Sequence, residues 1–441
     1  MTDRAFDIAI IGGGASGTLL ALHLMRQSSS QLRVALIDRS GVFGRGVAYA
    51  DGTTDHLLNT RIGDMSAWPD DPGHFVRWLP EGTHDFVQRR DYGRYLEAGL
   101  EQAEAASAGR LSLIHAEVTD LQPGDDASTL RLAASSTLTA RRVVLATGHR
   151  PPGADQGALR GNPWDDAALA GLRPSASLLL IGTGLTMIDL IAALNDRGHH
   201  GRIVAVSRRG LLPRPHLSEA PKGPHGAPPA ALLTGELSLR LAAFRQLVRE
   251  GMPWGSLMLS LRPNNEALWE QLDDRQQRRF LRHLRPWWDV HRHRVAPAAD
   301  AKIQARIASG DLVVARGRIL ALDPKGDEVE AKIAMAGAPS GTSMRFDRVI
   351  DCRGPRNDIA EGAGLIARLA ARRLIRADDL GLALAANDED RLIDETGRAS
   401  RQLFALGPPT RGRHWEITAI PDIRRRAAAL AALLAEELRQ G

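Results

Sequence analysis

Two stretches of the chain repeat one pattern of apolar and glycine positions. In the first, an apolar run at 8–11 leads into the turn Gly12-Gly-Gly-Ala-Ser-Gly17 and then into helical periodicity as far as Arg26. A second apolar run, 32–37, follows and ends at Asp38. Short apolar runs bounded by glycine are typical of buried parallel strands, and apolar residues three to four apart predict a helix. The stretch therefore predicts a strand, a glycine turn, a helix, a second strand and a terminal acid.

The second stretch has the same order. An apolar run at 178–181 meets Gly182-Thr-Gly184, and a helix is expected over 188–197 and a strand over 202–207. Gly14 and Asp38 are 24 positions apart, as are Gly184 and Arg208, and the two stretches are about 170 residues apart. An internal repeat of this kind predicts an α/β fold with two Rossmann-like dinucleotide-binding domains.

Each glycine of the first turn has an expected function. Gly12 permits the tight turn, Gly14 lets the backbone approach a pyrophosphate, and Gly17 lets the helix pack closely on the strand. The helix N-terminus then presents free N–H groups to the phosphates. Asp38, which lies 21 residues after Gly17, can accept hydrogen bonds from a ribose diol.

The second stretch differs at the position expected to contact the ribose. There the sequence is Ser207-Arg208-Arg209, and a pair of guanidinium groups can bind a 2′-phosphate that a carboxylate would repel. The alternative is two solvated arginines in an arginine-rich chain. The sequence favours FAD on the first domain and NADPH on the second, although Met187 replaces the third glycine.

The remaining periodicity predicts further elements. Strands are expected over 111–118, 129–133, 143–148, 312–322, 328–335, 348–354 and 402–406. Helices are expected over 89–106, 232–248, 266–287 and 423–438. Residues 217–300 interrupt the second domain, and their aromatic residues either line a substrate channel or form a small helical core.

Composition excludes several classes of function. Only four of the 57 basic residues are lysine, and the arginines are spread from end to end, so the net charge of +5 does not indicate nucleic-acid binding. The single cysteine, Cys352, excludes an internal disulfide, a Cys-x-x-Cys redox pair and a multi-cysteine zinc site. No metal site is expected, because His291-Arg-His293 lacks a placed acid. Without a secretory signal pattern or a membrane-spanning apolar run, we expect a cytoplasmic protein.

These motifs together resemble those of the FAD-NAD(P)-binding family of flavoproteins with two dinucleotide-binding domains, which is related to class B flavin monooxygenases and adrenodoxin-reductase-like enzymes. The resemblance covers nearly the whole chain except 217–300. The matching motifs are Gly12–Gly17, Gly44-Arg-Gly-Val-Ala-Tyr49, His56-Leu-Leu-Asn59, Ala146-Thr-Gly148, Gly182–Gly184, Gly354-Pro355, Ala405-Leu-Gly-Pro408 and Trp415-Glu-Ile-Thr418.

The resemblance implies a glutathione-reductase-like architecture in which the NADPH domain is inserted in the FAD domain. The FAD domain would comprise 1–170 and a return segment, 345–441, and the NAD(P)H domain would comprise 171–344. Ala146-Thr-Gly148 would mark the crossing between domains, and a helix N-terminus near Ile417 and Thr418 would face the flavin pyrimidine edge.

The resemblance also implies a set of cofactor-binding residues. For FAD these are Gly12, Gly14, Ser16, Gly17, Asp38, Arg39, Asn59, Met65, Val118, Thr147, Gly148, Gly407, Trp415, Ile417 and Thr418. For NADPH they are Gly182, Gly184, Thr186, Arg208 and Arg209. No catalytic residue stands out; the candidates are His56, Arg61, His149 and Trp415. Residues that could supply pocket polarity are His56, Arg61, His149 and Arg150.

The resulting hypothesis is an FAD-dependent NADPH oxidoreductase, foremost a monooxygenase that uses O₂ and a small nitrogen- or sulfur-containing nucleophile or a carbonyl compound. In such an enzyme the cofactor supplies the chemistry, while the protein supplies position and water exclusion. An NADPH:acceptor reductase without oxygen insertion is the alternative, and a flavin protein without turnover is the third reading. The sequence determines neither the substrate nor the oligomeric state.

Overall fold

The computed structural model describes residues 4–27, 31–50, 56–149, 159–160, 162–164, 166–217, 227–335, 337–354 and 364–440. The chain divides into two compact units. The first comprises Met1–Gly52, Arg61–Arg150 and Asn357–Gly441, and the second comprises Thr53–Thr60 and Pro151–Arg356. The chain thus leaves the first unit, builds the second and returns, which confirms the predicted insertion of one domain in the other.

The first unit contains a sheet in the order β14-β15-β6-β1-β2-β3, in which the strands from β15 to β3 run parallel. A β4–β5 hairpin extends from β6. The strands are β1 (Arg4–Ile11), β2 (Val34–Asp38), β3 (Leu111–His115), β4 (Val118–Gln122), β5 (Ser128–Leu132), β6 (Thr137–Leu145), β14 (Arg391–Ile393) and β15 (Ala399–Ala405).

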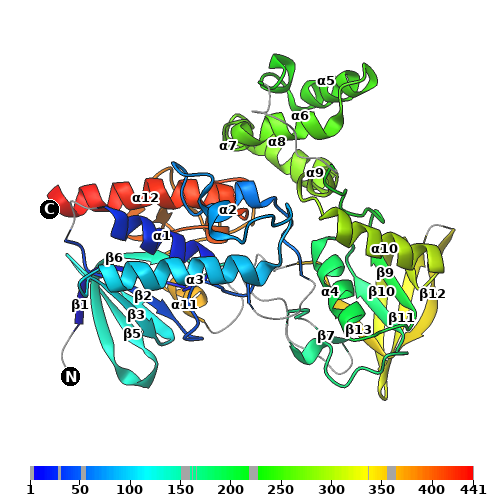
Figure 1. The fold of residues 1–441 in the computed structure, drawn as a ribbon, viewed down its shortest axis with the longest axis horizontal. Coiled ribbons are helices and arrows are strands. Elements are labelled where there is room, and N and C mark those ends of the chain that lie inside the picture. Colours follow the sequence, from blue (N-terminus) through cyan, green and yellow to red (C-terminus); the bar gives the residue numbers. More distant parts are fainter. Residues whose placement is uncertain are drawn as a thin grey trace. The chain divides into compact units, whose positions relative to one another are not determined.

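Helices cover this sheet. They are α1 (Ala15–Arg26), α2 (His74–Trp78), α3 (Arg89–Ala106), α11 (Leu365–Ala371) and α12 (Ile420–Gln440). Helix α1 packs against both α12 and α3, and the three lie alongside one another in Figure 1. The inner residues of β1, β2 and β6 are buried because helices on one face and the hairpin and α11 on the other exclude water from both sides of the sheet.

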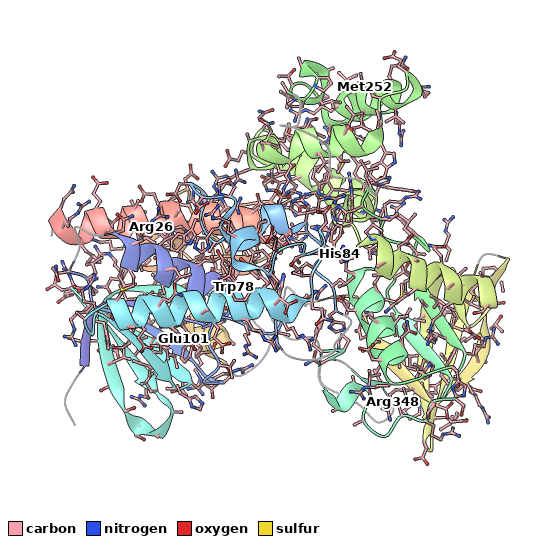
Figure 2. The ribbon with its side chains drawn as sticks, in the orientation of Figure 1. Arg26, Trp78, His84, Glu101, Met252 and Arg348 are labelled. Carbon is pink, nitrogen blue, oxygen red and sulfur yellow. The ribbon has the colours of Figure 1, made fainter. Side chains whose placement is uncertain are left out.

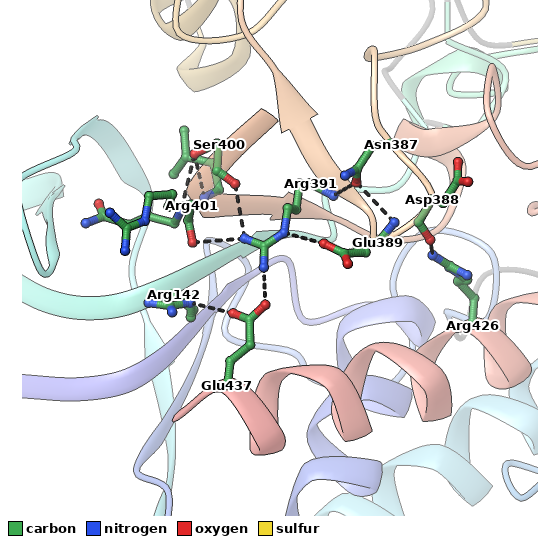
Figure 3. Close-up of polar contacts among 11 residues, drawn as sticks. Arg142, Asn387, Asp388, Glu389, Arg391, Ser400, Arg401, Arg426 and Glu437 are labelled. Atoms are coloured by element: carbon green, nitrogen blue, oxygen red, sulfur yellow. Dashed lines mark hydrogen bonds and ion pairs between the residues drawn. The ribbon is translucent and has the colours of Figure 1, made fainter. Parts of the chain in front are cut away.

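The C-terminal helix is attached to the sheet by charged hydrogen bonds as well as by its apolar face. Glu437 of α12 accepts from Arg142 Nε of β6 at 3.1 Å and from the guanidinium of Arg391 of β14 (Figure 3). The same Arg391 also donates through Nε to Glu389 at 2.7 Å. One helix position therefore links a strand from the first half of the chain to one from the last quarter.

The second unit has a sheet in the order β12-β11-β10-β9-β8-β13-β7, parallel from β10 to β7 and antiparallel at β11 and β12. Its strands are β7 (Leu159–Arg160), β8 (Leu178–Ile181), β9 (Ile203–Ser207), β10 (Leu312–Lys325), β11 (Glu328–Met335), β12 (Ala338–Phe346) and β13 (Arg348–Asp351). Helices α4 (Leu185–Asp196) and α10 (Pro297–Ser309) pack together beside it. The predicted fold class, two Rossmann-like domains in an α/β protein, is confirmed.

The stretch between β9 and α10 is helical, as predicted. It contains α5 (Leu237–Arg249), α6 (Trp254–Leu261), α7 (Asn265–Glu270), α8 (Asp274–Arg279), a π-helical turn (Phe280–Leu284) and α9 (Arg285–Arg292). Trp269 and Phe280 are buried and in edge contact, so these two aromatics belong to a small helical core, whereas Trp287 is exposed. Met252, labelled in Figure 2, is exposed on the turn between α5 and α6.

Candidate functional site

The turn between β1 and α1 has a shape that only glycine permits at two positions. Gly12 has φ +113°, and a Cβ atom there would lie 2.3 Å from the Ala146 carbonyl oxygen. A Cβ atom at Gly17 would lie 2.0 Å from the Gly12 carbonyl oxygen. Strand β6 and helix α1 therefore approach the turn so closely that no side chain fits between them.

Gly14 is different, because the space beside it is open within the protein. A Cβ atom at Gly14 would make an ordinary contact of 3.4 Å with Gly46 Cα. Gly14 is the N-cap of α1, and Ser16 lies buried in the first turn. A backbone without side chains at a helix N-terminus suits a phosphate group, because the free N–H groups and the helix dipole both favour an anion.

The loop that contains Gly44 and Tyr49 folds onto this turn. Gly44 N donates to the Gly13 carbonyl at 2.8 Å, and Arg45 forms an ion pair of 2.6 Å with Glu97 of α3. A Cβ atom at Gly93 of α3 would lie 2.4 Å from the Tyr49 carbonyl oxygen. The loop is thus fixed between the dinucleotide turn and α3.

Asp38 lies at the carboxyl end of β2, where a ribose is expected. Its Oδ2 accepts from Gly13 N at 2.7 Å, and its Oδ1 accepts from Ser40 N at 2.8 Å and Ser40 Oγ at 2.6 Å. An ionised carboxylate has about four acceptor positions, so Asp38 can still accept from a ribose hydroxyl. The neighbouring Arg39 is exposed, and its carbonyl accepts from His115 Nε2 at 3.1 Å.

The returning segment of the chain reaches the same end of the sheet. Gly407 follows β15 with φ +80°, and a Cβ atom there would lie 2.4 Å from Ser16 Oγ of α1. Trp415 and Ile417 are buried beyond it, and Thr418 is half-buried. Helix α12 begins at Ile420, three residues before the start predicted from periodicity at 423 and just after the N-terminus that the resemblance implied near Ile417 and Thr418. Thr418 N and Ala419 N both form turns back to the Glu416 carbonyl.

The segment before α12 is held by a buried polar network that the sequence analysis missed. His414 Nε2 donates to Asp390 Oδ1 at 2.8 Å, and Arg426 Nε donates to Asp390 Oδ2 at 2.6 Å. Asp390 is fully buried, and a buried carboxylate must have such partners. Glu416 is also buried and adopts φ +74°, an uncommon conformation for a residue with a side chain. Only the acid-rich stretch 388–390 hinted at this network in the sequence.

The turn of the second unit repeats that of the first. Gly182 has φ +116°, and a Cβ atom there would lie 2.6 Å from the Cys352 carbonyl oxygen. Gly184 is the N-cap of α4 and has open space beside it, and Thr186 is half-buried in the first turn. Met187, in place of the third glycine, is fully buried in the core beneath the sheet.

The strand pairing corrects the expected position of Arg208. Ile11 pairs with Ile37 in the first unit, and Ile181 pairs with Val206 in the second. The residue that follows, and so corresponds to Asp38, is Ser207 rather than Arg208. Counting 24 residues from the glycine was wrong because the connection from α4 to β9 is one residue shorter than that from α1 to β2.

Ser207 is also hydrogen-bonded to the glycine turn and to the turn that follows it, but it carries no charge. Its Oγ accepts from Thr183 Oγ1 at 2.8 Å and from Gly210 N at 3.0 Å. Arg208 and Arg209 follow on the exposed turn, and the Arg209 guanidinium lies 6.0 Å from the ring centroid of Trp287 in α9. The second unit thus has a neutral serine where the first has an acid, and two arginines follow that serine on the turn.

The other candidate residues have varied surroundings. Among them, Thr147 lies against the first turn, where a Cβ atom at Gly12 would be 3.2 Å from Thr147 Cα. His56 and Asn59 belong to the second unit, where His56 Nε2 donates to the Asp189 carbonyl at 2.9 Å and the Asn59 carbonyl accepts from His216. Arg61 forms an ion pair with Asp85 in the first unit. Met65 and Val118 are buried, Thr147 and His149 are exposed, and Gly148 has φ +66°. Arg150 and Pro355 lie outside the described residues.

The chain's one cysteine is unsuited to redox chemistry. Cys352 is buried behind the second turn, and burial together with the charges of Asp351 and Asp189 raises the pKa of its thiol well above the usual range. The thiolate is the reactive form of cysteine. Cys352 therefore stays protonated and packs in the core.

The comparison with protein families gives one match. The model of the family described as FAD-NAD(P)-binding matches residues 9–150. The match covers about a third of the chain. This FAD-NAD(P)-binding segment contains the first dinucleotide turn, Asp38 and the loop from Gly44 to Tyr49. Among the described residues, no helix is long and apolar enough to cross a membrane, and no cluster of three side chains could hold a metal ion.

Similar proteins extend the comparison beyond the FAD-NAD(P)-binding segment. Nitrosuccinic acid synthase npaA of Aspergillus oryzae is 25% identical over 301 residues, which are 55% of this chain and 46% of the relative. The chain therefore spans about half the length of that curated relative.

Among solved structures, ornithine N-hydroxylase of Kutzneria sp. 744 matches 99% of this chain and 100% of its own at a TM-score of 0.65 and 15% identity. L-lysine 6-monooxygenase of Pseudomonas syringae matches 98% of this chain and 99% of its own, also at 0.65 and 15%. Thioredoxin reductase of Lactococcus lactis matches 99% of this chain and 100% of its own at 0.56 and 11%. These similarities show the fold: two dinucleotide-binding domains of the flavoprotein type.

Proposed function

We propose that the protein is an FAD-dependent monooxygenase that oxidises NADPH and hydroxylates a nitrogen atom of a small amine. The observation that carries the proposal is the similarity of nearly the whole chain, insertion included, to ornithine N-hydroxylase and L-lysine 6-monooxygenase. Nitrosuccinic acid synthase, which is similar in sequence, is named after a product that contains an oxidised nitrogen. The substrate we propose is accordingly narrower than the nitrogen, sulfur or carbonyl compound expected from the sequence.

FAD fits the first unit. Gly14 leaves room for a pyrophosphate at the N-terminus of α1, and Asp38 retains acceptor capacity for the ribose. The returning segment brings Gly407 against Ser16, and the start of α12 follows within the same unit. Bound FAD supplies the redox and oxygen chemistry. The positive end of the α12 dipole is suited to stabilise negative charge on its pyrimidine edge.

NADPH fits the second unit for an electrostatic reason. Ser207 is neutral where Asp38 carries a negative charge, so the 2′-phosphate of NADPH meets no repulsion there. Arg208 and Arg209 extend from the adjacent exposed turn and can bind that phosphate through charge-assisted hydrogen bonds. We therefore retain Arg208 and Arg209 as proposed NADPH ligands, although neither occupies the position of Asp38.

The cysteine content separates the proposed reaction from that of the reductases with the same fold. A reductase that exchanges electrons with a disulfide through a dithiol centre needs two reactive cysteines. This chain has one, Cys352, and it is buried with a raised pKa. An NADPH:acceptor reductase that needs no thiol remains the competing function, and the experiment below distinguishes it.

The test is to purify the protein with FAD and to follow NADPH and O₂ consumption with ornithine, lysine, cadaverine and aspartate as candidate amines. We expect one class of amine to stimulate both rates in parallel, with little free hydrogen peroxide and a product 16 mass units heavier. Rapid reduction of artificial acceptors under nitrogen, with no amine-dependent O₂ uptake, would instead establish the reductase. The expected cytoplasmic location stays a prediction that cell fractionation can test.

A further inference from the structure

A third arginine lies beside the carboxyl end of β9, on the neighbouring strand β10. Arg316 pairs directly with Ser207 across the parallel β9–β10 ladder. Paired residues of neighbouring strands lie about 4.8 Å apart and project to the same face of the sheet. Arg316 is exposed, so its charged group reaches solvent beside the turn that holds Arg208 and Arg209.

The turn after β9 fixes this relation. Gly210 has φ +62°, and a Cβ atom there would lie 3.1 Å from Arg316 N and 3.3 Å from Arg316 Cβ. The backbone of the Ser207–Gly210 turn therefore crosses the base of the Arg316 side chain. In the first unit the turn Asp38–Gly41 is placed likewise, with a Cβ atom at Gly41 lying 2.8 Å from the ring of His115, which pairs with Asp38. The two units thus share this arrangement of turn and neighbouring strand, but differ in charge.

Three guanidinium groups at one edge of a sheet repel one another unless an anion lies between them. Among the described residues, no carboxylate forms an ion pair with Arg208, Arg209 or Arg316. The Arg209 guanidinium is instead oriented by the ring of Trp287. By contrast, Arg353, which follows β13, and Arg173, which precedes β8, each bind an aspartate.

We propose that Arg316 is a further specificity-determining residue, which binds the 2′-phosphate of NADPH together with Arg208 and Arg209. The proposal rests on the proposed function of the second unit as an NADPH domain and adds a ligand from a different strand. A phosphate held from both the β9 turn and β10 is contacted from two sides. Its recognition therefore depends on the pairing of Ser207 with Arg316 as well as on the exposed turn.

The experiment measures binding of 2′,5′-ADP and 5′-AMP to the full-length FAD-loaded protein by calorimetry, so that catalysis is not involved. We expect Arg316→Ala to weaken binding of 2′,5′-ADP roughly tenfold, the effect of losing one charge-assisted hydrogen bond, and to leave 5′-AMP unchanged. Arg316→Lys should recover only part, because lysine lacks the planar fork. The matched control is Arg202→Ala, which removes an equally exposed charge next to the opposite end of β9.

Each outcome decides one of the two proposals. Loss of 2′,5′-ADP binding in Arg316→Ala but not in Arg202→Ala supports the assignment. Equal losses of 2′,5′-ADP binding in Arg316→Ala and Arg202→Ala would mean that Arg316 contributes only to the general positive potential, and would overturn its assignment. Unchanged binding in Arg316→Ala, while Arg208→Ala weakens binding, would overturn it too. A wild-type protein that binds 2′,5′-ADP no better than 5′-AMP would overturn the NADPH preference itself, and with it the assignment of Arg316.

Discussion

The three glycines of the first dinucleotide turn meet different surroundings. At Gly12 and Gly17 the fold itself excludes a Cβ atom, because backbone oxygens lie within 2.3 Å of its position. At Gly14 the nearest atom would be 3.4 Å away, and its φ of −74° is open to any residue. Folding therefore requires glycine at positions 12 and 17. Glycine at position 14 is instead explained by a bound ligand that needs the space beside it.

This difference gives a prediction for Gly14→Ala. The added methyl group fits the apoprotein, so we expect a loss of about 1 kcal/mol in the free energy of unfolding, the cost of alanine at an N-cap. The same methyl group enters the space of the pyrophosphate, so FAD affinity should fall at least tenfold. Urea unfolding of the apoprotein and flavin titration measure the two effects separately. Gly17→Ala is the control and should fail to fold; full FAD affinity in Gly14→Ala would show that the pyrophosphate lies elsewhere.

Individual residues were predicted correctly where the turn motif fixes their distance along the chain. The prediction failed where a connection of variable length lies between two residues. Gly12 and Gly182 lie in the tight turns expected for them, and Gly17 lets helix α1 approach the first turn closely, as expected. Ser207 was missed as the counterpart of Asp38 because residue counting cannot detect a helix–strand connection that is one residue shorter. Arg316 and His414 were missed because their partners, Ser207 and Asp390, are distant in sequence.

Elements with strong periodicity were predicted to within a few residues. Helix α3 and strands β8 and β11 have the expected bounds. Strand β12 was missed because its sequence, Ala338–Phe346, is rich in polar and small residues, and it forms a strand only through antiparallel pairing with β11. Helix α10 was also missed, although Pro297 in its first turn is a helix-start signal.

Helix α12 illustrates how a predicted element is fixed by contacts that no periodicity reveals. Glu437 accepts charged hydrogen bonds from two strands, and its side chain and those of Arg142 and Arg391 are about one-fifth exposed or less (Figure 3). We expect Glu437→Gln to lower the free energy of unfolding by about 1–2 kcal/mol, somewhat less than the full value of charged hydrogen bonds because solvent screens part of the charge.

Glu436 provides a matched control for this measurement. It is the neighbouring residue on α12 and is exposed. Within the described part of the chain, its side chain accepts a hydrogen bond only from Gln440 of the same helix. Glu436→Gln should therefore change the free energy of unfolding by less than about 0.5 kcal/mol. Urea unfolding followed by far-ultraviolet circular dichroism compares the two variants. Equal effects would mean that the contacts of Glu437 with the sheet add nothing to stability.

At the scale of the whole molecule, the first unit is assembled from distant parts of the sequence. Strand β6 pairs with β1 on one side and with β15 on the other, and α12 covers α1. The sequence predicted this return because a second dinucleotide motif interrupts the first domain and a last apolar strand follows it. It could not predict that Thr53–Thr60 groups with the second unit, since the contacts of His56 and Asn59 there are with residues more than a hundred positions away.

The divided first unit predicts how fragments behave. A fragment of residues 1–150 lacks β15 and α12, so one edge of β6 loses its partner at 143–145 and the apolar face of α1 is uncovered. Unpaired strand edges and exposed apolar faces cause aggregation. We therefore expect the fragment to be insoluble or to elute as large aggregates without flavin.

Joining 1–150 to 357–441 through a short flexible linker restores both elements and should give a monomeric, yellow protein that unfolds cooperatively. Size-exclusion chromatography with absorbance at flavin wavelengths compares the two fragments directly. Soluble, FAD-loaded material from 1–150 alone would show that the return of the chain is dispensable for the first unit, whereas aggregation of both would show that the second unit is also needed for it to fold.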